Sequence, residues 1–242
     1  MKISAAQTRP IRGDIQANIE KHKKLIELAV SNGAEMIIFP ELSLTGYEPA
    51  LAKKLAPDQN DKRLDDFQKI SNARKIIICV GMPTKRYPGI LISMMIFQPY
   101  KQVQIYSKQY LHDDEKTFFT HGQEQVFLTD GENKIGFAIC YEISVPEHSE
   151  RIYRAGADIY IASVAKFVTG IDKAINTISG IAKKYSMITI MSNCIGECDG
   201  QECAGKTSIW NNKGELTGQL NDTNEGIIMV DTETGEITEQ AL

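Results

Sequence analysis

Long apolar runs are missing from this sequence of 242 residues, and its start shows no basic segment followed by an apolar one. A helix needs about 20 mostly apolar residues to cross a membrane, and a secretory leader needs an apolar stretch of roughly 7–15. We therefore expect a cytoplasmic protein without a membrane partner.

A dominant charge of either sign is also absent, because 27 Lys and Arg face 31 Asp and Glu, for a net charge of −4. Proteins that bind nucleic acid usually carry a basic patch or stripe. We expect no nucleic-acid partner and a small molecule as the ligand. The chain is 42% hydrophobic and has no linker or low-complexity segment, so one domain over residues 1–242 is expected.

The five cysteines form an odd set, which argues against a disulfide scaffold. Three of them lie in CIGECDGQEC, namely Cys194, Cys198 and Cys203. Their spacing differs from the paired C-x-x-C zinc pattern, and no histidine is near to complete four ligands. We expect no metal and no cofactor, with Cys194 as a core residue at a strand end. Cys198 and Cys203 are interpreted as loop residues that could line a cleft.

Three chemically useful residues each end a strand-like stretch. Glu41 follows Met36-Ile37-Ile38-Phe39-Pro40, Lys108 closes the alternating stretch from Val103, and Cys140 ends a strand that begins near Lys134. An isolated cysteine after an apolar strand is more often a small buried hydrophobe, but α/β enzymes place reacting groups at strand ends. A base, a cation and a thiol together are the components of thiol-based amide hydrolysis.

The flanking segments FPELSLTGY, YSKQYLHDDE and IGFAICYEISVPE, in this order, are similar to those of the nitrilase superfamily of carbon–nitrogen hydrolases. The similarity runs over nearly the whole chain, from the opening strand Lys2-Ile3-Ser4-Ala5-Ala6-Gln7 to Ser192-Asn193-Cys194. This resemblance implies a hydrolase that cleaves a small amide or N-carbamoyl compound and releases ammonia or an amine.

The resemblance also implies roles for particular residues. Cys140 would attack the amide carbonyl and form a thioester, and Glu41 would take and return the proton. Lys108 and the backbone N–H of Tyr141 would hold the oxyanion, and water would then release the acid. Glu115 is the best match to a second glutamate that the family carries beside the lysine.

Secondary-structure patterns predict two sheets flanked by helices, and the resemblance sharpens this to a four-layer α-β-β-α sandwich. Helices are expected over 14–32, 62–74, 146–156 and 169–185, and strands over 35–39, 75–80, 90–97, 102–106, 125–129, 133–139, 158–162 and 187–192. Residues 206–232 are expected to be rich in strands. By analogy with the family we expect a homodimer or a larger assembly. The apolar sides of helices 146–156 and 169–185 are the candidate surface, and the alternative is that these residues belong to the core.

Substrate recognition is predicted from residues near the strand ends. Tyr47, Phe118, Phe119 and Phe167 could form an apolar wall, and Glu142, Ser163 and Lys166 could supply polar contacts. An ammonium of Lys166 inside the cleft would favour a substrate with a carboxylate, such as an ω-amide of a dicarboxylic acid. The alternative is that Lys166 pairs with a surface acid.

A histidine base would be the alternative mechanism, and the chain has four histidines. His22 is interpreted as part of a solvated helix face, and His148 as lying on the surface, as capping a carboxylate, or near Cys140. His112 and His121 could shape the pocket entrance. The Cys-His pair is the weaker hypothesis.

Within the superfamily, an amidase or carbamoyl-amidase is favoured over a nitrile hydrolase, which is generally longer. The apolipoprotein acyltransferase branch is excluded by the missing membrane helices, and the glutaminase part of an ammonia-channelling synthetase by the missing synthetase domain. The alternatives from other classes are a catalytically silent metabolite-binding protein and a thiol redox sensor that uses Cys140 with Cys194. Neither alternative explains why a glutamate and a lysine accompany the thiol.

Overall fold

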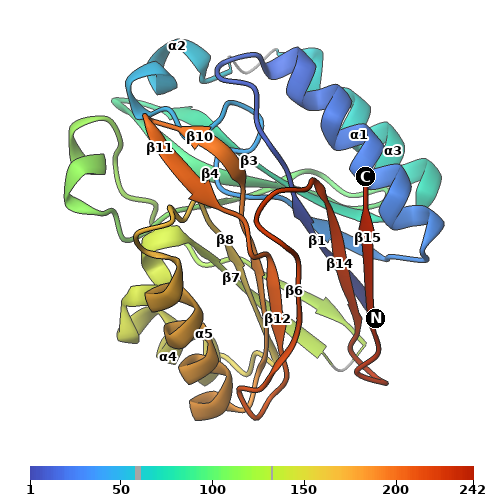
Figure 1. Cartoon of the computed structure of the whole chain (residues 1–242). Helices are drawn as coiled ribbons and strands as arrows, with labels where there is room; N and C mark the ends of the chain where they lie inside the picture. The colour runs from blue at the N-terminus through green and yellow to red at the C-terminus, as the bar shows by residue number, and fades with distance from the viewer. Residues whose placement is uncertain (58–60, 132) are drawn as a thin grey trace.

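The computed structural model of the chain describes residues 1–57, 61–131 and 133–242. Two β-sheets face each other, and helices cover the outer side of each sheet (Figure 1). This is the four-layer α-β-β-α arrangement predicted from the sequence.

The first sheet contains seven strands within the described residues, in the order β15-β14-β1-β2-β3-β4-β5. The strands β1, β2 and β3 are parallel, whereas β4, β5, β14 and β15 join antiparallel. Their bounds are β1 Lys2–Gln7, β2 Met36–Ile38, β3 Ile77–Arg86, β4 Gly89–Phe97, β5 Gln104–Ser107, β14 Gly226–Asp231 and β15 Ile237–Ala241.

The second sheet contains six strands in the same described part of the chain, in the order β13-β12-β9-β8-β7-β6. Their bounds are β6 Phe127–Asp130, β7 Asn133–Ile139, β8 Ile159–Ser163, β9 Ile188–Ser192, β12 Ser208–Trp210 and β13 Leu216–Gln219. The strands β7, β8 and β9 are parallel, so their carboxyl ends meet at one edge of the sheet.

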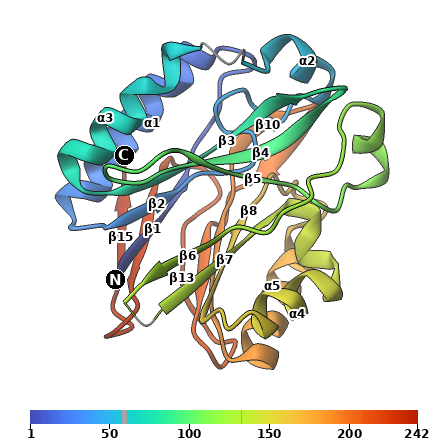
Figure 2. The ribbon, with the colours of Figure 1, turned by 180° about the vertical axis from the view of Figure 1, so that it is seen from behind.

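Helices α1 (Ile15–Ser31) and α3 (Asp65–Arg74) cover the first sheet, and α4 (Pro146–Arg154) and α5 (Ile171–Tyr185) cover the second (Figure 2). Asp14 caps α1 by accepting a hydrogen bond from the backbone N–H of Ala17 at 3.0 Å, as predicted. The short helix α2 (Ala52–Leu55) and four 3₁₀ turns complete the described elements: η1 Pro49–Leu51, η2 Lys62–Leu64, η3 Asp113–Thr117 and η4 Cys140–Ser144.

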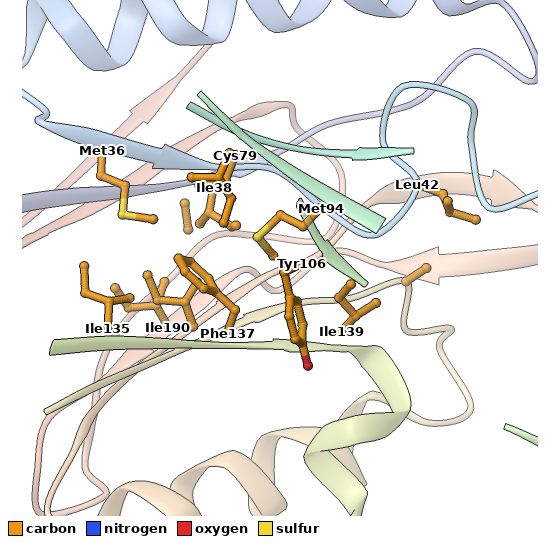
Figure 3. Packing of buried hydrophobic residues seen from close by; sticks show 14 of the residues in the cluster. Met36, Ile38, Leu42, Cys79, Met94, Tyr106, Ile135, Phe137, Ile139 and Ile190 are labelled. Atoms are coloured by element: carbon orange, nitrogen blue, oxygen red, sulfur yellow. The ribbon is translucent and has the colours of Figure 1, made fainter. Parts of the chain in front are cut away.

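The main core fills the space between the two sheets (Figure 3). On β7 the residues that point into this core alternate with smaller ones that face the helices, as a strand's period of two requires. Gly136 is one of the smaller ones, and a Cβ there would lie 2.4 Å from Cγ2 of Ile152 on α4. The glycine therefore lets α4 approach the sheet closely. The labelled core residues are Met36, Ile38, Leu42, Cys79, Met94, Tyr106, Ile135, Phe137, Ile139 and Ile190.

Two expectations about the fold are wrong. The segment of Cys198 and Cys203 is not a loop but an antiparallel hairpin of β10 (Ile195–Cys198) and β11 (Gln201–Ala204). His22 is not solvated, because its ring is 1% exposed, stacks on Phe39 and contacts the Ser43 hydroxyl at 2.9 Å.

The apolar sides of α4 and α5 pack against the second sheet, which is the second of the two alternatives for these residues. They therefore belong to the core, and pairing of two copies stays a prediction. Among the described residues, no helix combines the length and the apolar character that spanning a membrane requires.

Candidate active site

The predicted site residues come from different sheets and meet at one edge of the sandwich. Glu41 follows β2 and Lys108 follows β5, both in the first sheet, whereas Cys140 directly follows β7 in the second. Glu115 lies on η3, seven positions beyond Lys108. The site exists only where the two sheets pack against each other.

Lys108 is a fully buried cation held between two carboxylates. Its Nζ donates to Oε1 of Glu41 at 2.8 Å and to Oε1 of Glu115 at 2.6 Å. Glu115 also accepts a hydrogen bond from the Tyr47 hydroxyl at 3.0 Å and one from the backbone N–H of His112 at 2.8 Å. A buried charge is tolerated only when it is paired and hydrogen-bonded in this way.

The charges around Lys108 determine the protonation states. Burial alone would lower the pKa of Lys108, but the negative charges of Glu41, Cys140 and Glu115 outweigh it and raise the pKa. The pKa of Glu41 is raised by burial, which the charge of Lys108 opposes and that of Glu115 reinforces. Lys108 therefore stays cationic, and Glu41 is a stronger proton acceptor than an exposed glutamate.

One oxygen of Glu41 is left for chemistry. Oε2 is buried and has no hydrogen-bond partner of good geometry among the described residues. The thiol of Cys140 is close enough to lower the pKa of this carboxyl as a donor. An unsatisfied buried carboxylate oxygen beside a thiol is placed to take the thiol proton.

Cys140 occupies a strained backbone conformation with φ +45°, in the left-handed region that favours glycine. This sharp turn between β7 and η4 projects the thiol away from the strand, and Sγ lies 3.9 Å from the carbonyl oxygen of Ala165. Burial and the charge of Glu41 raise the pKa of Cys140 to about 11, although Lys166 and Lys108 act in the opposite direction. The resting group at neutral pH is therefore a thiol that needs a base.

A cavity of about 280 Å³ opens at the thiol. This volume is at the lower limit of small-molecule pockets, which run from about 300 to 1,000 Å³. The cavity is lined by Tyr47, His112, Asp114, Glu115, Cys140, Tyr141, Ala165, Lys166, Phe167, Thr169, Gly170 and Gln201. The sequence did not indicate Thr169, Gly170 and Gln201 as lining residues because they lie outside the motifs, and Asp114 lies within YSKQYLHDDE but was given no role.

Of the predicted recognition residues, Tyr47, Lys166 and Phe167 line this cavity. Phe118 and Phe119 do not, since the former is 44% exposed on the surface and the latter is buried in the core. Ser163 is also away from the cavity, because its hydroxyl is buried and donates to the carbonyl oxygen of Phe39 at 2.8 Å.

Glu142 is turned away from the cavity and buried beneath the turn of Cys140. Its Oε1 accepts backbone N–H bonds from Gln109 at 2.6 Å and Tyr110 at 3.3 Å. Its Oε2 accepts from the Tyr106 hydroxyl at 2.6 Å and the backbone N–H of Ile139 at 2.7 Å. Burial raises its pKa to about 7 against these bonds. Glu142 thus ties the segment after Lys108 to the turn that carries the thiol.

The three histidines nearest the site have different surroundings, and of the two expected at the cavity entrance His112 alone lines the cavity. His148 is buried, contacts the Tyr106 hydroxyl at 2.9 Å and has its pKa lowered to about 3 by burial. His112 lines the cavity, whereas His121 is exposed and contacts the carbonyl oxygen of Gln109 at 2.8 Å. Within the described residues, none of the four histidines hydrogen-bonds to Cys140, so the Cys-His arrangement is not formed.

Cys194, Cys198 and Cys203 form a second group of thiols, which we call the cysteine cluster. Their Sγ atoms all lie within 4.8 Å of one another, and each residue is 1% exposed. Cys140 is not a member of this cluster. The expectation that Cys198 and Cys203 line the cleft is wrong, because neither is exposed to the cavity.

Comparisons with known proteins agree with the geometry. A family model described as carbon-nitrogen hydrolase matches residues 2–241. A nitrilase from Pyrococcus abyssi is 27% identical over 94% of this chain and 87% of its own length. A 2-oxoglutaramate amidase from Bacillus subtilis is 26% identical over 98% of this chain and 92% of its own length.

Other relatives are longer or known by structure. A glutamine-dependent NAD(+) synthetase from Acinetobacter baylyi is 24% identical over 90% of this chain, which spans only 41% of that protein. Among solved structures, the amidase from Nesterenkonia sp. AN1 in complex with butyramide has a TM-score of 0.86 at 21% identity. It covers 96% of this chain and 90% of its own.

Proposed function

The chain belongs to the carbon–nitrogen hydrolase family, and we propose that it hydrolyses the amide bond of a small molecule through a thioester on Cys140. The observation that carries this proposal is the buried cluster of Glu41, Lys108 and Glu115 beside a thiol that opens into a cavity. This arrangement supplies a base, an electrophilic cation and a nucleophile in one place.

In the first half-reaction, Oε2 of Glu41 takes the proton from Cys140 as Sγ attacks the carbonyl carbon of the amide. The carbonyl oxygen becomes an oxyanion, held by Nζ of Lys108 and the backbone N–H of Tyr141. The C–N bond then breaks, and the protonated Glu41 returns the proton to the departing ammonia or amine. A thioester on Cys140 remains.

In the second half-reaction, Glu41 takes a proton from water as the water oxygen attacks the thioester. The same donors hold the oxyanion, the C–S bond breaks, and the proton returns to the sulfur as the carboxylic acid leaves. Glu115 and Tyr47 do not react; their hydrogen bonds keep Lys108 aimed at the carbonyl.

A neighbouring structure supports a cysteine nucleophile. A Glu-to-Leu mutant of the amidase from Nesterenkonia sp. AN1 is described with the acetamide moiety of fluoroacetamide added covalently at its active-site cysteine. The whole-length match to a 2-oxoglutaramate amidase supports an amide as the substrate.

The substrate class proposed is an ω-amide that carries a distal carboxylate. Lys166 lines the cavity, and its positive charge acts on the thiol of Cys140. Its backbone N–H is fixed by Oδ1 of Asn193 at 2.8 Å. Among the ion pairs of the described residues, none involves Lys166, so its ammonium is available to a bound anion.

An ammonia-release assay tests the reaction. The panel contains ω-amides such as L-glutamine and succinamate, N-carbamoyl compounds and simple aliphatic amides, run beside Cys140→Ala with intact-protein mass spectrometry. We expect release that requires Cys140 and an acyl adduct trapped on it. If no compound of the panel releases ammonia and Cys140 does not react with iodoacetamide, a binding protein would be favoured.

A second assay tests the role of Lys166. Succinamate and butyramide differ by a terminal carboxylate, and we compare their kcat/KM in the wild type, in Lys166→Ala and in the exposed control Lys213→Ala. A hydrogen bond to a charged group contributes about 1.5–3 kcal/mol, so the preference for succinamate should fall roughly 10- to 150-fold in Lys166→Ala only. Equal preference in all three proteins would remove Lys166 from recognition.

A further inference from the structure

The proposed amide hydrolysis does not use the cysteine cluster. The arrangement of its three cysteines follows from the pairing of β10 with β11. In the hairpin of β10 and β11, Cys203 is paired across the ladder with Gly196, which has no side chain. Cys194 and Cys198 lie two residues to either side of Gly196. The hairpin brings the three sulfurs within 4.8 Å of one another.

This sulfur spacing suits a single metal ion. A thiolate ligand lies about 2.3 Å from zinc, so sulfurs that share an ion lie about 4 Å apart. Bringing three sulfurs from within 4.8 Å to that separation needs shifts of only a few tenths of an ångström each. Each cysteine is 1% exposed, which matches the closed character of metal sites that have a structural role.

The three cysteine ligands determine which metal ions can bind. The group holds three cysteines and, within the described residues, no histidine or carboxylate. Sulfur-only sites select soft ions such as Cu⁺ and Zn²⁺, and oxygen-seeking ions such as Mg²⁺ and Ca²⁺ are excluded.

A positive charge lies beside the hairpin. The Arg9 guanidinium packs against Gly196, with Nη1 3.0 Å from the place that a Cβ would take. A cation close to a cysteine favours the thiolate form that binds metal.

Cys79 shows what an ordinary core cysteine looks like in this protein. It is fully buried among apolar side chains, and burial alone raises its pKa. The cysteine cluster differs because its three sulfurs lie within 4.8 Å of one another. Oxidation of these thiols is a weaker explanation, because an oxidant would have to reach sulfurs that are 1% exposed.

We propose that Cys194, Cys198 and Cys203 form a binding site for one thiophilic ion, Cu⁺ or Zn²⁺, held by three thiolates. Each S–H bond that breaks releases its proton to solvent as a metal–sulfur bond forms, and no oxidant is needed. The hairpin also borders the active-site cavity, through Gln201 and through the bridge between Cys203 and Phe167. A bound ion would therefore stiffen one wall of that cavity.

Titration of the reduced, chelator-treated protein tests the site. Zn²⁺ and anaerobic Cu⁺ are added in separate arms against a chromogenic chelator, using wild type and Cys140→Ser. We expect one equivalent of ion per chain in both proteins, and X-ray absorption should find three sulfurs at about 2.3 Å. A fourth, lighter neighbour distinguishes Zn²⁺ from three-coordinate Cu⁺. Failure of both ions to bind at micromolar free concentration would overturn the proposal.

Variants localise the ion. Cys198→Ser and Cys203→Ala should each weaken binding at least 100-fold, whereas Cys79→Ala, the matched buried control, should bind as the wild type does. If a cluster variant does not fold, alkylation of the wild type in increasing denaturant, with and without the ion, decides. The ion should protect Cys194, Cys198 and Cys203 to higher denaturant concentration and leave Cys140 reactive. Ion binding that is unchanged in both cluster variants would also overturn the site.

Discussion

Replacing Glu142 with glutamine tests whether this buried carboxylate positions the nucleophile. One oxygen becomes an NH₂ group, and four donors now face that side chain. If NH₂ replaced Oε1, it would face the backbone N–H groups of Gln109 and Tyr110, and both bonds would be lost. If it replaces Oε2, the Tyr106 hydroxyl can rotate, accept from the amide and donate to His148 instead.

The second orientation is the less costly one, because it loses only the bond from the backbone N–H of Ile139. A buried donor left unsatisfied costs about 1–3 kcal/mol. We therefore expect Glu142→Gln to lower the free energy of unfolding by about 1–3 kcal/mol, which for a chain of this length lowers the Tm by roughly 2–12 °C. Differential scanning calorimetry measures this.

The same change should slow catalysis, because Ile139 directly precedes Cys140 and Gln109 directly follows Lys108. We expect kcat to fall about 10- to 100-fold, and KM to change less than about threefold, since Glu142 does not line the cavity. Glu150→Gln is the matched control. It makes the same substitution on an exposed residue paired with Arg154, and should change stability by at most about 0.5 kcal/mol. A Glu142→Gln protein with wild-type Tm and kcat would refute the positioning role.

The remaining predictions concern Glu41, the hydrogen bonds around Lys108 and two glycine positions. Because the charge of Glu41 raises the pKa of Cys140, the rate of Cys140 alkylation by iodoacetamide should increase with pH up to about 11 in the wild type. Its midpoint should move to lower pH in Glu41→Gln, and an unchanged midpoint would contradict this. Tyr47→Phe removes a hydroxyl that donates to a carboxylate at 3.0 Å, so kcat should fall about 10- to 150-fold in steady-state assays with Tm nearly unchanged. Gly81→Ala would place a Cβ 2.5 Å from the backbone nitrogen of Leu42, the residue after Glu41. This overlap should destabilise the protein by about 1–3 kcal/mol in thermal unfolding. Gly180→Ala, with open space around the Cβ in a helix, should stabilise it by about 0.5–1 kcal/mol, and equal Tm values for the two would refute the packing argument.

Helices and strands were predictable from the sequence where the spacing of apolar residues agreed with the residues that begin or end an element. The helix capped by Asp14 ends before Gly33, whose φ of +82° only glycine adopts readily. The strands that precede Glu41 and Cys140 are continuous apolar runs, which is typical of strands buried on both faces. Their existence required no knowledge of tertiary contacts.

Other features depended on tertiary contacts that no local pattern encodes. His22 is flanked by lysines and was expected in solvent, yet its spacing from Ile15, Ile19 and Ile26 places it on the buried face of α1. That signal was available in the sequence. In contrast, nothing local shows that Glu142 turns beneath the strand end, because three of its four partners lie 32 to 36 positions away.

The hairpin of β10 and β11 was missed for a different reason. Its strands are four residues each and contain glutamates and a glycine, so they lack the β-branched alternation that predicts a strand. Two thiols nine positions apart become neighbours only once this hairpin forms. A metal-ligand spacing rule applied to the sequence cannot anticipate that.

The order of strands in the first sheet has a consequence for synthesis on the ribosome. β1, among the first residues to be made, pairs along its full length with β14, residues 226–231, which are made more than two hundred positions later. Until β14 emerges, β1 is an unpaired edge and the layer that positions Glu41 and Lys108 is incomplete. A nascent chain that already contains Cys140 therefore has an incomplete first sheet. We expect the proposed site to be complete only when translation is nearly finished.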